Sequence, residues 1–435
     1  MKTLDKIPTS KIERATQLVK TGFKVGGNYM AYYGEKIVNP SLTKEKLNEN
    51  NAEDIYDGLK NLKGSALKVA QMLSMDKNIM PRAYVEKFSL AQFSVPPLSA
   101  PLVRKTFKKY LGKFPEELYD SFTPDSINAA SIGQVHQATK NGKKLAVKIQ
   151  YPGVADSIGS DLAIVKPFAI SMFNLQGKDS DRYFQEVENK LLEETDYELE
   201  LAQGIDITEK CSIIPNLRFP KYYADLSSKK TITMDWMEGE HLSEFTAYNT
   251  DREKGDKLGQ ALWDFYMFQI HKLRQVHADP HPGNFLIDKD SNLIAIDFGC
   301  MKKVPNDFYV PYFELAIPAI INNPKIFSEK MYELEILRID DSEKEIKYFT
   351  ELFHGLLSLF TKPFHGDYFD FSDDDFFEQI GNLGEQLTKD TQLRKMNGNR
   401  GSQHFIYINR TFFGLYNLLH DLKARVNTKN YEKYM

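Results

Sequence analysis

The residues of this sequence with the clearest chemical potential form a short loop that contains His277, Asp279 and Asn284. Their spacing, His-x-Asp-x-x-x-x-Asn, is typical of the catalytic loop of kinases. In such a loop the aspartate orients a nucleophilic oxygen and accepts its proton, while the asparagine offers a neutral oxygen to Mg²⁺. The pattern therefore predicts Asp279 as a catalytic residue and Asn284 as a metal ligand.

A second acidic motif, Asp297-Phe298-Gly299, begins thirteen residues after Asn284. A carboxylate at this point would be the charged Mg²⁺ ligand that bridges the phosphates of ATP. The intervening residues 285–296 contain two short apolar runs around a turn, which predicts a hairpin that brings Asn284 and Asp297 side by side. Either motif alone is weak evidence. Both motifs, joined by a segment of this length, favour a site for ATP and Mg²⁺.

A zinc site is the competing interpretation of the same loop. His277, Asp279 and His281 alternate along the chain, so on a regular strand their side chains would face one way and could bind zinc. Pro280 and Pro282 disfavour a regular strand at this point. The upstream features described next also have no place in a zinc site.

A phosphoryl-transfer site needs a cation that anchors the phosphates, and Lys148 is the candidate. It ends the run Leu-Ala-Val-Lys, which is similar to the strand signature of kinases, where the lysine contacts the α- and β-phosphates and pairs with a helix glutamate. The predicted partner is Glu194. Because Glu198 and Glu200 follow it closely, an acidic solvent-exposed helix face is the alternative interpretation of this stretch.

The segment before the lysine strand should cover the phosphates, but the usual glycine-rich pattern is absent. The sequence at 128–135 is Asn-Ala-Ala-Ser-Ile-Gly-Gln-Val. Alanine restricts the backbone, so we expect a stiff loop whose serine hydroxyl and backbone N–H groups bind phosphate oxygens. The predicted nucleotide-binding residues of this loop are Ala129, Ala130, Ser131, Gly133 and Val135.

The elements that must position these residues change in kind along the chain. Apolar periodicity predicts helices over 12–33, 45–75, 100–111, 182–203 and 252–275, and a mostly helical region after 305. Strands are predicted over 131–138, 145–150, 231–236, 285–287 and 293–296. This order favours the α+β class, with a two-lobed protein-kinase-like fold and an N-terminal helical extension. The predicted domains are a helical extension (1–110), an N-lobe with inserted helices (111–238) and a mainly helical C-lobe (239–435).

The composition of the 435 residues narrows the classes of protein that fit. A net charge of −4 argues against a nucleic-acid binder. Cys211 and Cys300 are far apart and form no disulfide framework, which favours a reducing compartment such as the cytoplasm. No apolar stretch is long enough to span a membrane. The basic amphipathic pattern at 12–33 has two interpretations, a helix that lies on an anionic membrane and a helix that packs on its own domain.

Taken together, these motifs resemble the UbiB family of atypical protein-kinase-like proteins, also called aarF-domain kinases. The resemblance runs from about Leu59 to Ala316 and includes the alanine-rich loop, the Ala-Val-Lys-Ile-Gln strand, the HADPHPGN loop and Asp-Phe-Gly. It also includes the segment at 67–74, which corresponds to the family's Lys-x-Gly-Gln motif. The combination is highly specific.

The resemblance implies roles for residues that the motifs alone do not assign. Lys68 and Gln71 would belong to an extension that folds over the active site and contacts the nucleotide. Asp196 would join Glu194 as the second acid of a Glu-x-Asp motif, and the backbone of Met237 would contact adenine. The sequence departs from the family's pattern at two positions, because Ala70 replaces the glycine of the Lys-x-Gly-Gln motif and Asn128 replaces the first alanine of the loop. These departures bear on the closure of the extension and on nucleotide binding, and both leave the chemical groups of the site in place.

By the same resemblance, the protein would be an ATP-dependent phosphoryl-transfer enzyme, an ATPase or atypical kinase, that uses ATP and Mg²⁺ in quinone or isoprenoid lipid metabolism. A lipid or quinone-precursor ligand and peripheral contact with the inner face of a membrane are the implied partners. Two other functions stay open. A small-molecule phosphotransferase shares the catalytic loop but lacks the alanine-rich loop. A nucleotide-gated lipid-binding protein would need no catalysis.

Overall fold

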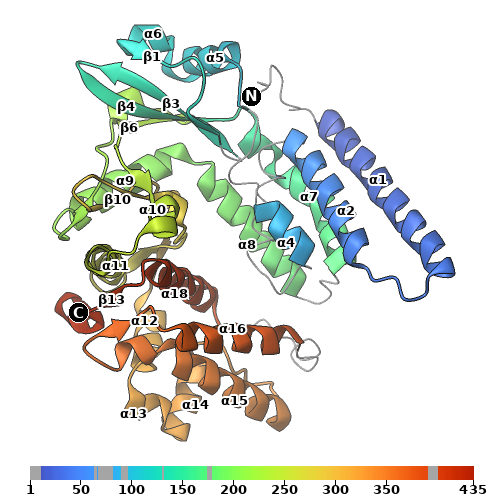
Figure 1. The fold of residues 1–435 in the computed structure, drawn as a ribbon, viewed down its shortest axis with the longest axis vertical. Helices are drawn as coiled ribbons and strands as arrows, with labels where there is room; N and C mark the ends of the chain where they lie inside the picture. The colour runs from blue at the N-terminus through green and yellow to red at the C-terminus, as the bar shows by residue number, and fades with distance from the viewer. Residues whose placement is uncertain are drawn as a thin grey trace. The chain divides into compact units, whose positions relative to one another are not determined.

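The structure is a computed structural model. It describes residues 11–62, 66, 82–89, 97–129, 132–173, 179–389 and 400–435. The chain forms two compact units (Figure 1). The first contains residues 1–202 and 221–236, and the second contains 203–220 and 237–435. The division into three domains at 110 and 238 stays a prediction.

The first unit is built on a small antiparallel sheet. Its long strands are β3 (Gly133–Lys140) and β4 (Lys143–Gln150), joined by a turn in which Asn141 and Gly142 both have positive φ. This is the Asn-Gly turn that the sequence predicts. The sheet order is β1-β3-β4-β6, and β2 also pairs with β3. The shorter strands are β1 (Ser121–Phe122), β2 (Asn128–Ala129) and β6 (Thr231–Asp235).

One face of this sheet carries the hydrophobic core of the first unit. Side chains alternate along β4, so Leu145, Val147 and Ile149 point to one face and are buried. They pack in one cluster with Phe107 of α5 (Ala100–Leu111) and with Tyr119. Lys148 therefore points to the opposite face, away from this cluster.

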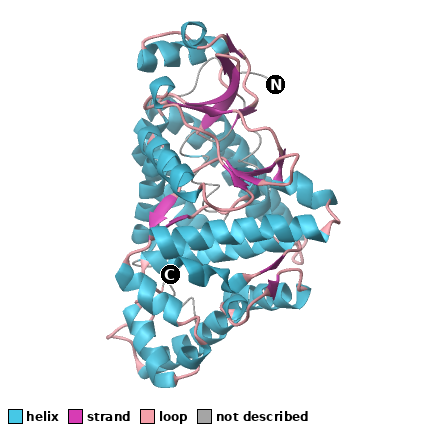
Figure 2. Cartoon of the chain, turned by 90° about the vertical axis from the view of Figure 1, so that its left-hand side faces the viewer, coloured by secondary structure: helices cyan, strands magenta, loops and turns pink. Residues whose placement is uncertain are grey.

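Helices make up the rest of the first unit (Figure 2). The predicted helix at 12–33 is α1 and the predicted helix at 100–111 is α5. The predicted helix at 45–75 is described only to residue 62, and its remainder lies mostly outside the described residues. Helix α7 was not predicted; it begins directly after a Pro-Gly turn. The helices are α1 (Lys11–Val38), α2 (Glu45–Leu62), α4 (Arg82–Ser89), α6 (Pro115–Leu118), α7 (Val154–Phe173) and α8 (Asp179–Glu194). They are followed by α9 (Tyr197–Cys211), whose residues from Gln203 onward belong to the second unit.

The single helix predicted over 182–203 is wrong, because the chain breaks it into α8 and α9. Asp196 lies between the two helices, and its carboxylate accepts a hydrogen bond from the Leu199 backbone N–H at 3.0 Å. Aspartate is a favoured N-terminal cap, because its oxygen satisfies a donor that the first helical turn leaves unpaired. The chain changes direction at this break, so the acidic residues after 196 lie on α9 and not on a continuation of α8.

The second unit contains a four-stranded sheet and many helices. The sheet order is β5-β10-β9-β7, with β9 (Phe285–Ile287) antiparallel to β10 (Leu293–Ala295) as predicted. Asp288 closes the turn of this hairpin by accepting hydrogen bonds from the backbone of Asp290 and Asn292. The other strands of the unit are β5 (Leu217–Arg218), β7 (Glu240–His241), β8 (Gln275–His277), β11 (Met301–Lys303), β12 (Phe369–Asp370) and β13 (Arg425–Val426).

The helix predicted over 252–275 is too long. Helix α11 (Arg252–Met267) gives way to a π-helical turn at Phe268–Leu273 and then to β8. Arg274 has a φ of 54°, a left-handed conformation that ends the helical path. The buried Gln269 side chain accepts a hydrogen bond from the His277 backbone N–H at 2.9 Å. Tertiary contacts with β8 and β11 thus decide where this helix stops.

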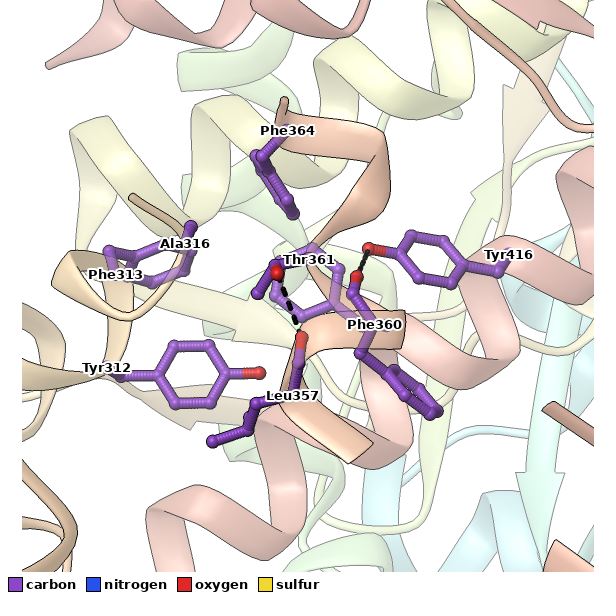
Figure 3. Close-up of a pocket in the computed structure, with 9 residues that line it drawn as sticks. Tyr312, Phe313, Ala316, Leu357, Phe360, Thr361, Phe364 and Tyr416 are labelled. Carbon is purple, nitrogen blue, oxygen red and sulfur yellow. Dashed lines mark hydrogen bonds between the residues drawn. The ribbon is translucent and has the colours of Figure 1, made fainter. Parts of the chain in front are cut away.

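The region after 305 is mostly helical, as predicted. Aromatic side chains from α12, α15 and α18 meet around a small pocket (Figure 3). The Tyr416 hydroxyl donates to the Phe360 carbonyl at 2.9 Å, and the Thr361 hydroxyl donates to the Leu357 carbonyl at 2.8 Å. The pocket is therefore part of the packing between these helices. The helices of this region are α12 (Asn306–Glu314), α13 (Pro318–Ile321), α14 (Pro324–Glu333), α15 (Glu343–Phe360), α16 (Asp374–Lys389) and α18 (Gln403–Asp421). Helix α10 (Leu242–Tyr248) of the second unit comes earlier in the chain, directly after β7.

Candidate active site

Lys148 has a defined acidic partner in the first unit. Its ammonium nitrogen lies 2.6 Å from a carboxylate oxygen of Glu200, and both side chains are largely buried. The same nitrogen lies 5.3 Å from the centre of the Tyr197 ring, a distance at which a cation is attracted to an aromatic face. The ion pair and the ring hold the lysine at the centre of β4, on the face opposite the core.

The sequence predicts Glu194 as the acid beside Lys148, whereas the structure makes the ion pair with Glu200. Glu194 ends α8, and Glu200 lies in the first turns of α9, after the helix break at Asp196. Gln150, two residues after Lys148 on the same face of β4, donates to the Thr195 carbonyl at 2.8 Å and so ties the strand to this break. The assignment of Glu194 stays a prediction. The signal that was missed is the capping aspartate, which shows that a new helix begins before Glu200.

The alanine-rich segment forms part of a short antiparallel pair. Ala129 of β2 pairs with Gln134 of β3, and Val135 lies opposite Lys148 on the next strand. Val135 and Lys148 therefore share one face of the sheet. A Cβ atom at Gly133 would lie 2.7 Å from the Tyr197 hydroxyl and 2.8 Å from the Ile149 carbonyl, so only glycine fits. The packing around Tyr197 thus requires this glycine, and its role in nucleotide binding stays a prediction.

Four of the predicted nucleotide-binding residues, Lys68, Gln71, Ala130 and Ser131, lie outside the described residues. Met237, the predicted adenine contact, is half-buried and is the first residue of the second unit after β6.

In the second unit, the predicted catalytic loop follows β8 without a break. His277 is buried at the end of β8, which pairs with β11 so that His277 lies opposite Met301. The next peptide group continues this contact, because the Ala278 N–H donates to the Cys300 carbonyl at 2.8 Å. The two strands fix the position of the chain immediately before Asp279.

Asp279 and Asn284 are held together by hydrogen bonds. The Asn284 amide nitrogen donates to the Asp279 carbonyl at 2.9 Å and lies 3.4 Å from the Asp279 carboxylate. Between them, a short 3₁₀ turn at Pro282–Asn284 is capped by His281, whose ring nitrogen Nδ1 accepts the Gly283 N–H at 3.0 Å. The amide nitrogen of Asn284 is a hydrogen-bond donor and is directed at Asp279. The amide oxygen of Asn284 is therefore the atom that can bind a cation.

The β9–β10 hairpin places Asp297 beside Asn284, as predicted. The Ile296 N–H donates to the Asn284 carbonyl at 3.1 Å, so the two chain segments are hydrogen-bonded at the residue before Asp297. One carboxylate oxygen of Asp297 accepts the Gly299 N–H at 2.9 Å. Phe298 is fully buried, and its ring centre lies 6.0 Å from that of His277. The Asp-Phe-Gly segment is thus packed against the start of the predicted catalytic loop.

This donor set suits Mg²⁺. The ion prefers oxygen ligands and is usually held by one or two protein groups, with phosphate oxygens and water completing its shell. Asn284 and Asp297 supply one amide oxygen and one carboxylate from adjacent backbone positions. Their identity as metal ligands stays a prediction.

The zinc interpretation is wrong. Within the described ranges, no group of three or more His, Cys, Asp or Glu side chains lies close enough together to hold a metal ion. His277 is buried near Tyr266, with 3.5 Å between its Nδ1 and the phenol oxygen. The Nδ1 of His281 accepts the Gly283 N–H and so caps the 3₁₀ turn.

Comparison with known families agrees with this geometry. Residues 90–331 match the model of the ABC1 atypical kinase-like domain, which is more than half of the chain. The chain belongs to the ABC1 atypical kinase-like family. This confirms the UbiB and aarF resemblance that the motifs indicate.

Several curated proteins are similar to this ABC1-family chain. It is 27% identical over 394 residues to the mitochondrial atypical kinase COQ8 of Saccharomyces cerevisiae, covering 88% of the chain and 77% of the relative. It is also 27% identical over 343 residues to an uncharacterized chloroplastic aarF domain-containing protein kinase of Arabidopsis thaliana, covering 77% of the chain. That match spans 48% of the Arabidopsis protein, so the chain spans about half the length of this relative.

A solved structure supports the fold. Rv3197 from Mycobacterium tuberculosis, in its complex with erythromycin, is 25% identical and superposes with a TM-score of 0.61. The likeness covers 89% of this chain and 96% of Rv3197. The α+β kinase-like fold predicted from the sequence is confirmed.

One contact that supports the predicted catalytic loop of this ABC1-family chain could not be predicted from the sequence. Gly414, inside α18, lies against Pro280, the residue after Asp279. A Cβ atom at Gly414 would lie 2.3 Å from Cγ of Pro280 and 3.2 Å from its carbonyl oxygen. The absence of a side chain at Gly414 thus lets α18 contact the loop directly, although the two residues are far apart in the chain.

We expect Gly414→Ala to lower ATP turnover by roughly 10²-fold, because displacing a positioned catalytic group by about 1 Å has an effect of this size. Alanine favours a helix over glycine by roughly 0.5–1 kcal/mol, so the helix itself should stay intact. The measurement is steady-state phosphate release by purified protein, with the melting temperature recorded beside it.

Gly381→Ala in α16 is the matched control, because a Cβ atom there would meet nothing within 4 Å. It should leave turnover unchanged. Equal activity of the Gly414→Ala and Gly381→Ala variants would show that α18 does not position Pro280.

Proposed function

We propose that this protein is a Mg²⁺-dependent ATPase or atypical kinase that supports quinone or isoprenoid lipid metabolism. The observation that carries the proposal is the buried ion pair between Lys148 and Glu200, at 2.6 Å. A buried lysine is costly unless it is paired. A lysine held in this way on a central strand, in a kinase-like family, supports a role as the phosphate anchor.

The other residues fit the same reaction. Mg²⁺, when bound, neutralises charge on the transferring phosphate groups. Asn284 and Asp297 would hold the ion, and Asp279 would orient the attacking oxygen and accept its proton. The hydrogen bonds from Asn284 to Asp279 restrict the motion of the loop, so catalysis would rest on positioning and electrostatics.

The lipid part of the proposal rests on family likeness, since the UbiB resemblance links such proteins to quinones and one relative bears the name COQ8. Isoprenoid lipids reside in membranes, so we include peripheral membrane contact in the proposal. No described helix is both long enough and apolar enough to cross a bilayer.

The test is ATP binding and turnover by the purified full chain. Binding is measured by calorimetry with and without Mg²⁺, and turnover by phosphate release. Both are repeated with anionic vesicles and with quinone-like phenols. We expect Lys148→Ala to lower ATP affinity or turnover at least tenfold, because the phosphates lose their cationic partner.

Lys143→Ala is the matched control, because Lys143 is exposed at the start of the same strand. It should behave like the wild type. Absence of both Mg²⁺-ATP binding and turnover under every condition would refute the enzyme proposal. Rapid phosphorylation of free hydroxylated small molecules would instead identify a small-molecule phosphotransferase.

A further inference from the structure

Helix α1 exposes an apolar stripe that no described element covers. Phe23 is 78% exposed, Met30 75% and Ile37 83%, and Val19 and Tyr33 are more than half exposed. Single exposed apolar residues are common, but a contiguous apolar patch usually marks an interaction site. The apolar stripe is defined here as Val19, Phe23, Met30, Tyr33 and Ile37.

The spacing of the apolar stripe puts all five side chains on one side of the helix. At about 100° per residue, they lie within about 40° of the direction of Val19. The span from Val19 to Ile37 is about 27 Å at 1.5 Å per residue. No charged residue falls within this sector between Val19 and Ile37, and the remaining position in it is Gly26. The apolar stripe is therefore continuous along the helix.

The opposite side of α1 is already occupied. Thr21, Val25 and Tyr32 are buried there. The Asn28 amide donates to Asn51 at 3.0 Å and to Asp54 at 2.9 Å, both on α2. Gly58 of α2 approaches so closely that a Cβ atom there would lie 2.1 Å from the Thr21 hydroxyl oxygen. Because α2 fixes this side, the apolar stripe faces away from α2. Helix α1 itself lies at the outer edge of the helices of the first unit (Figure 1).

The charges of α1 indicate which partner fits. The helix contains five basic residues against two acidic ones, in a chain whose net charge is −4. Lys20 and Lys36 lie to either side of the apolar stripe, at about 100° from its centre. An anionic lipid surface attracts these basic residues and accepts apolar side chains at the boundary between headgroups and acyl chains. The basic residues are Lys11, Arg14, Lys20, Lys24 and Lys36, and the acidic ones are Glu13 and Glu35.

We propose that α1 lies on an anionic lipid bilayer through the apolar stripe, with Lys20 and Lys36 at the headgroups. Helix α1 is too polar on its other sides to span the bilayer, so it would lie along the surface. The inference rests on the membrane contact included in the proposed function and adds the surface that makes it. It also combines the two interpretations of the helix predicted over 12–33, because α1 packs on its own unit with one side and leaves the other side for lipid.

The experiment is vesicle flotation with the full chain and two vesicle compositions. One contains phosphatidylcholine alone, and the other contains phosphatidylcholine with phosphatidylglycerol. We expect the wild type to float with the anionic vesicles and much less with the neutral ones. The double variant Phe23→Ser/Ile37→Ser should bind the anionic vesicles at least tenfold more weakly, with an unchanged melting temperature because both side chains are exposed.

The matched control is Ile213→Ser/Ile339→Ser, which removes two apolar side chains that are 70% and 100% exposed in the second unit. It should float like the wild type. Equal flotation of all three proteins, or no flotation of the wild type, would overturn the proposal. So would a change from dimer to monomer in the stripe variant without lipid, which would make the apolar stripe a self-association surface.

ATP binding in lipid-free solution separates this inference from the enzymatic proposal. Flotation of a wild type that binds no Mg²⁺-ATP would support the lipid surface and refute the enzymatic function. Loss of flotation in the stripe variant, with normal ATP binding, would support both.

Discussion

Substitution of Asp297 by asparagine should nearly abolish ATP turnover. We expect a loss on the order of 10³-fold, because charge stabilisation by a bound metal is worth several kcal/mol and about 1.4 kcal/mol corresponds to a factor of ten. The substitution removes one negative charge and preserves the size of the side chain. Asparagine also keeps an oxygen that can accept the Gly299 N–H, so the local turn should persist.

The effect should appear as a change in Mg²⁺ dependence. Asn284 already contributes a neutral oxygen, so Asp297→Asn would leave no charged protein ligand in the predicted metal pair. We expect the Mg²⁺ concentration for half-maximal activity to rise at least tenfold, because Mg²⁺ gives up its hydration water reluctantly and needs charged ligands. The measurement is phosphate release across a Mg²⁺ titration at saturating ATP.

Asp290→Asn provides the matched control for this variant. Asp290 is exposed in the turn of the same β9–β10 hairpin, so its substitution removes the same charge at a different point of one element. Its activity and Mg²⁺ dependence should match those of the wild type. If Asp297→Asn retains the wild-type Mg²⁺ dependence, Asp297 is not a metal ligand.

Most of the candidate site in the second unit could be predicted from local sequence motifs. A short hairpin brings Asn284 and Asp297 together, and its two strands and turn all lie within the twelve consecutive residues 285–296. Such contacts need no knowledge of distant segments, which is why sequence spacing was sufficient. The contact between Gly414 and Pro280 joins segments that are far apart in the chain. No pattern in the sequence near either residue predicts it.

The helix predictions failed where tertiary contacts override periodicity. The sequence from 252 to 275 keeps apolar spacing, yet α11 ends at Met267 and a π-helical turn follows to Leu273. The chain then enters β8, where the His277 N–H donates to the Gln269 side chain. The stretch from 182 to 203 also keeps its spacing, but Asp196 caps a new helix. Apolar periodicity reports which side is buried and does not report where one helix axis ends and another begins.

The helix break at Asp196, which was not predicted from the sequence, leads to a test that distinguishes Glu200 from Glu194 as the partner of Lys148. We expect Glu200→Gln to lower ATP turnover on the order of 10²-fold, since small displacements of a positioned group have effects of this size. The Lys148–Glu200 pair is largely buried. Removing one charge of such a pair leaves the other without compensation, so Lys148 should shift toward another acidic or aqueous environment.

The same variant should also be less stable. Breaking a buried ion pair by removing one partner costs about 3–5 kcal/mol, and glutamine should reduce this cost because its oxygen can still accept a hydrogen bond from Lys148. Thermal unfolding followed by circular dichroism checks this, and it must be measured beside activity so that a loss of folded protein is not mistaken for a loss of catalysis.

Two further substitutions complete the comparison. Glu198→Gln alters a neighbour on α9 that is 60% exposed and lies 3.8 Å from Lys229, so it should leave both activity and stability unchanged. Glu194→Gln tests the acid predicted from the sequence. If Glu194→Gln inactivates the enzyme while Glu200→Gln does not, the acid that positions Lys148 during turnover is Glu194, and the ion pair seen in the structure belongs to a different state. If Glu200→Gln alone inactivates it, the helix break at Asp196 is what presents the functional glutamate to the lysine.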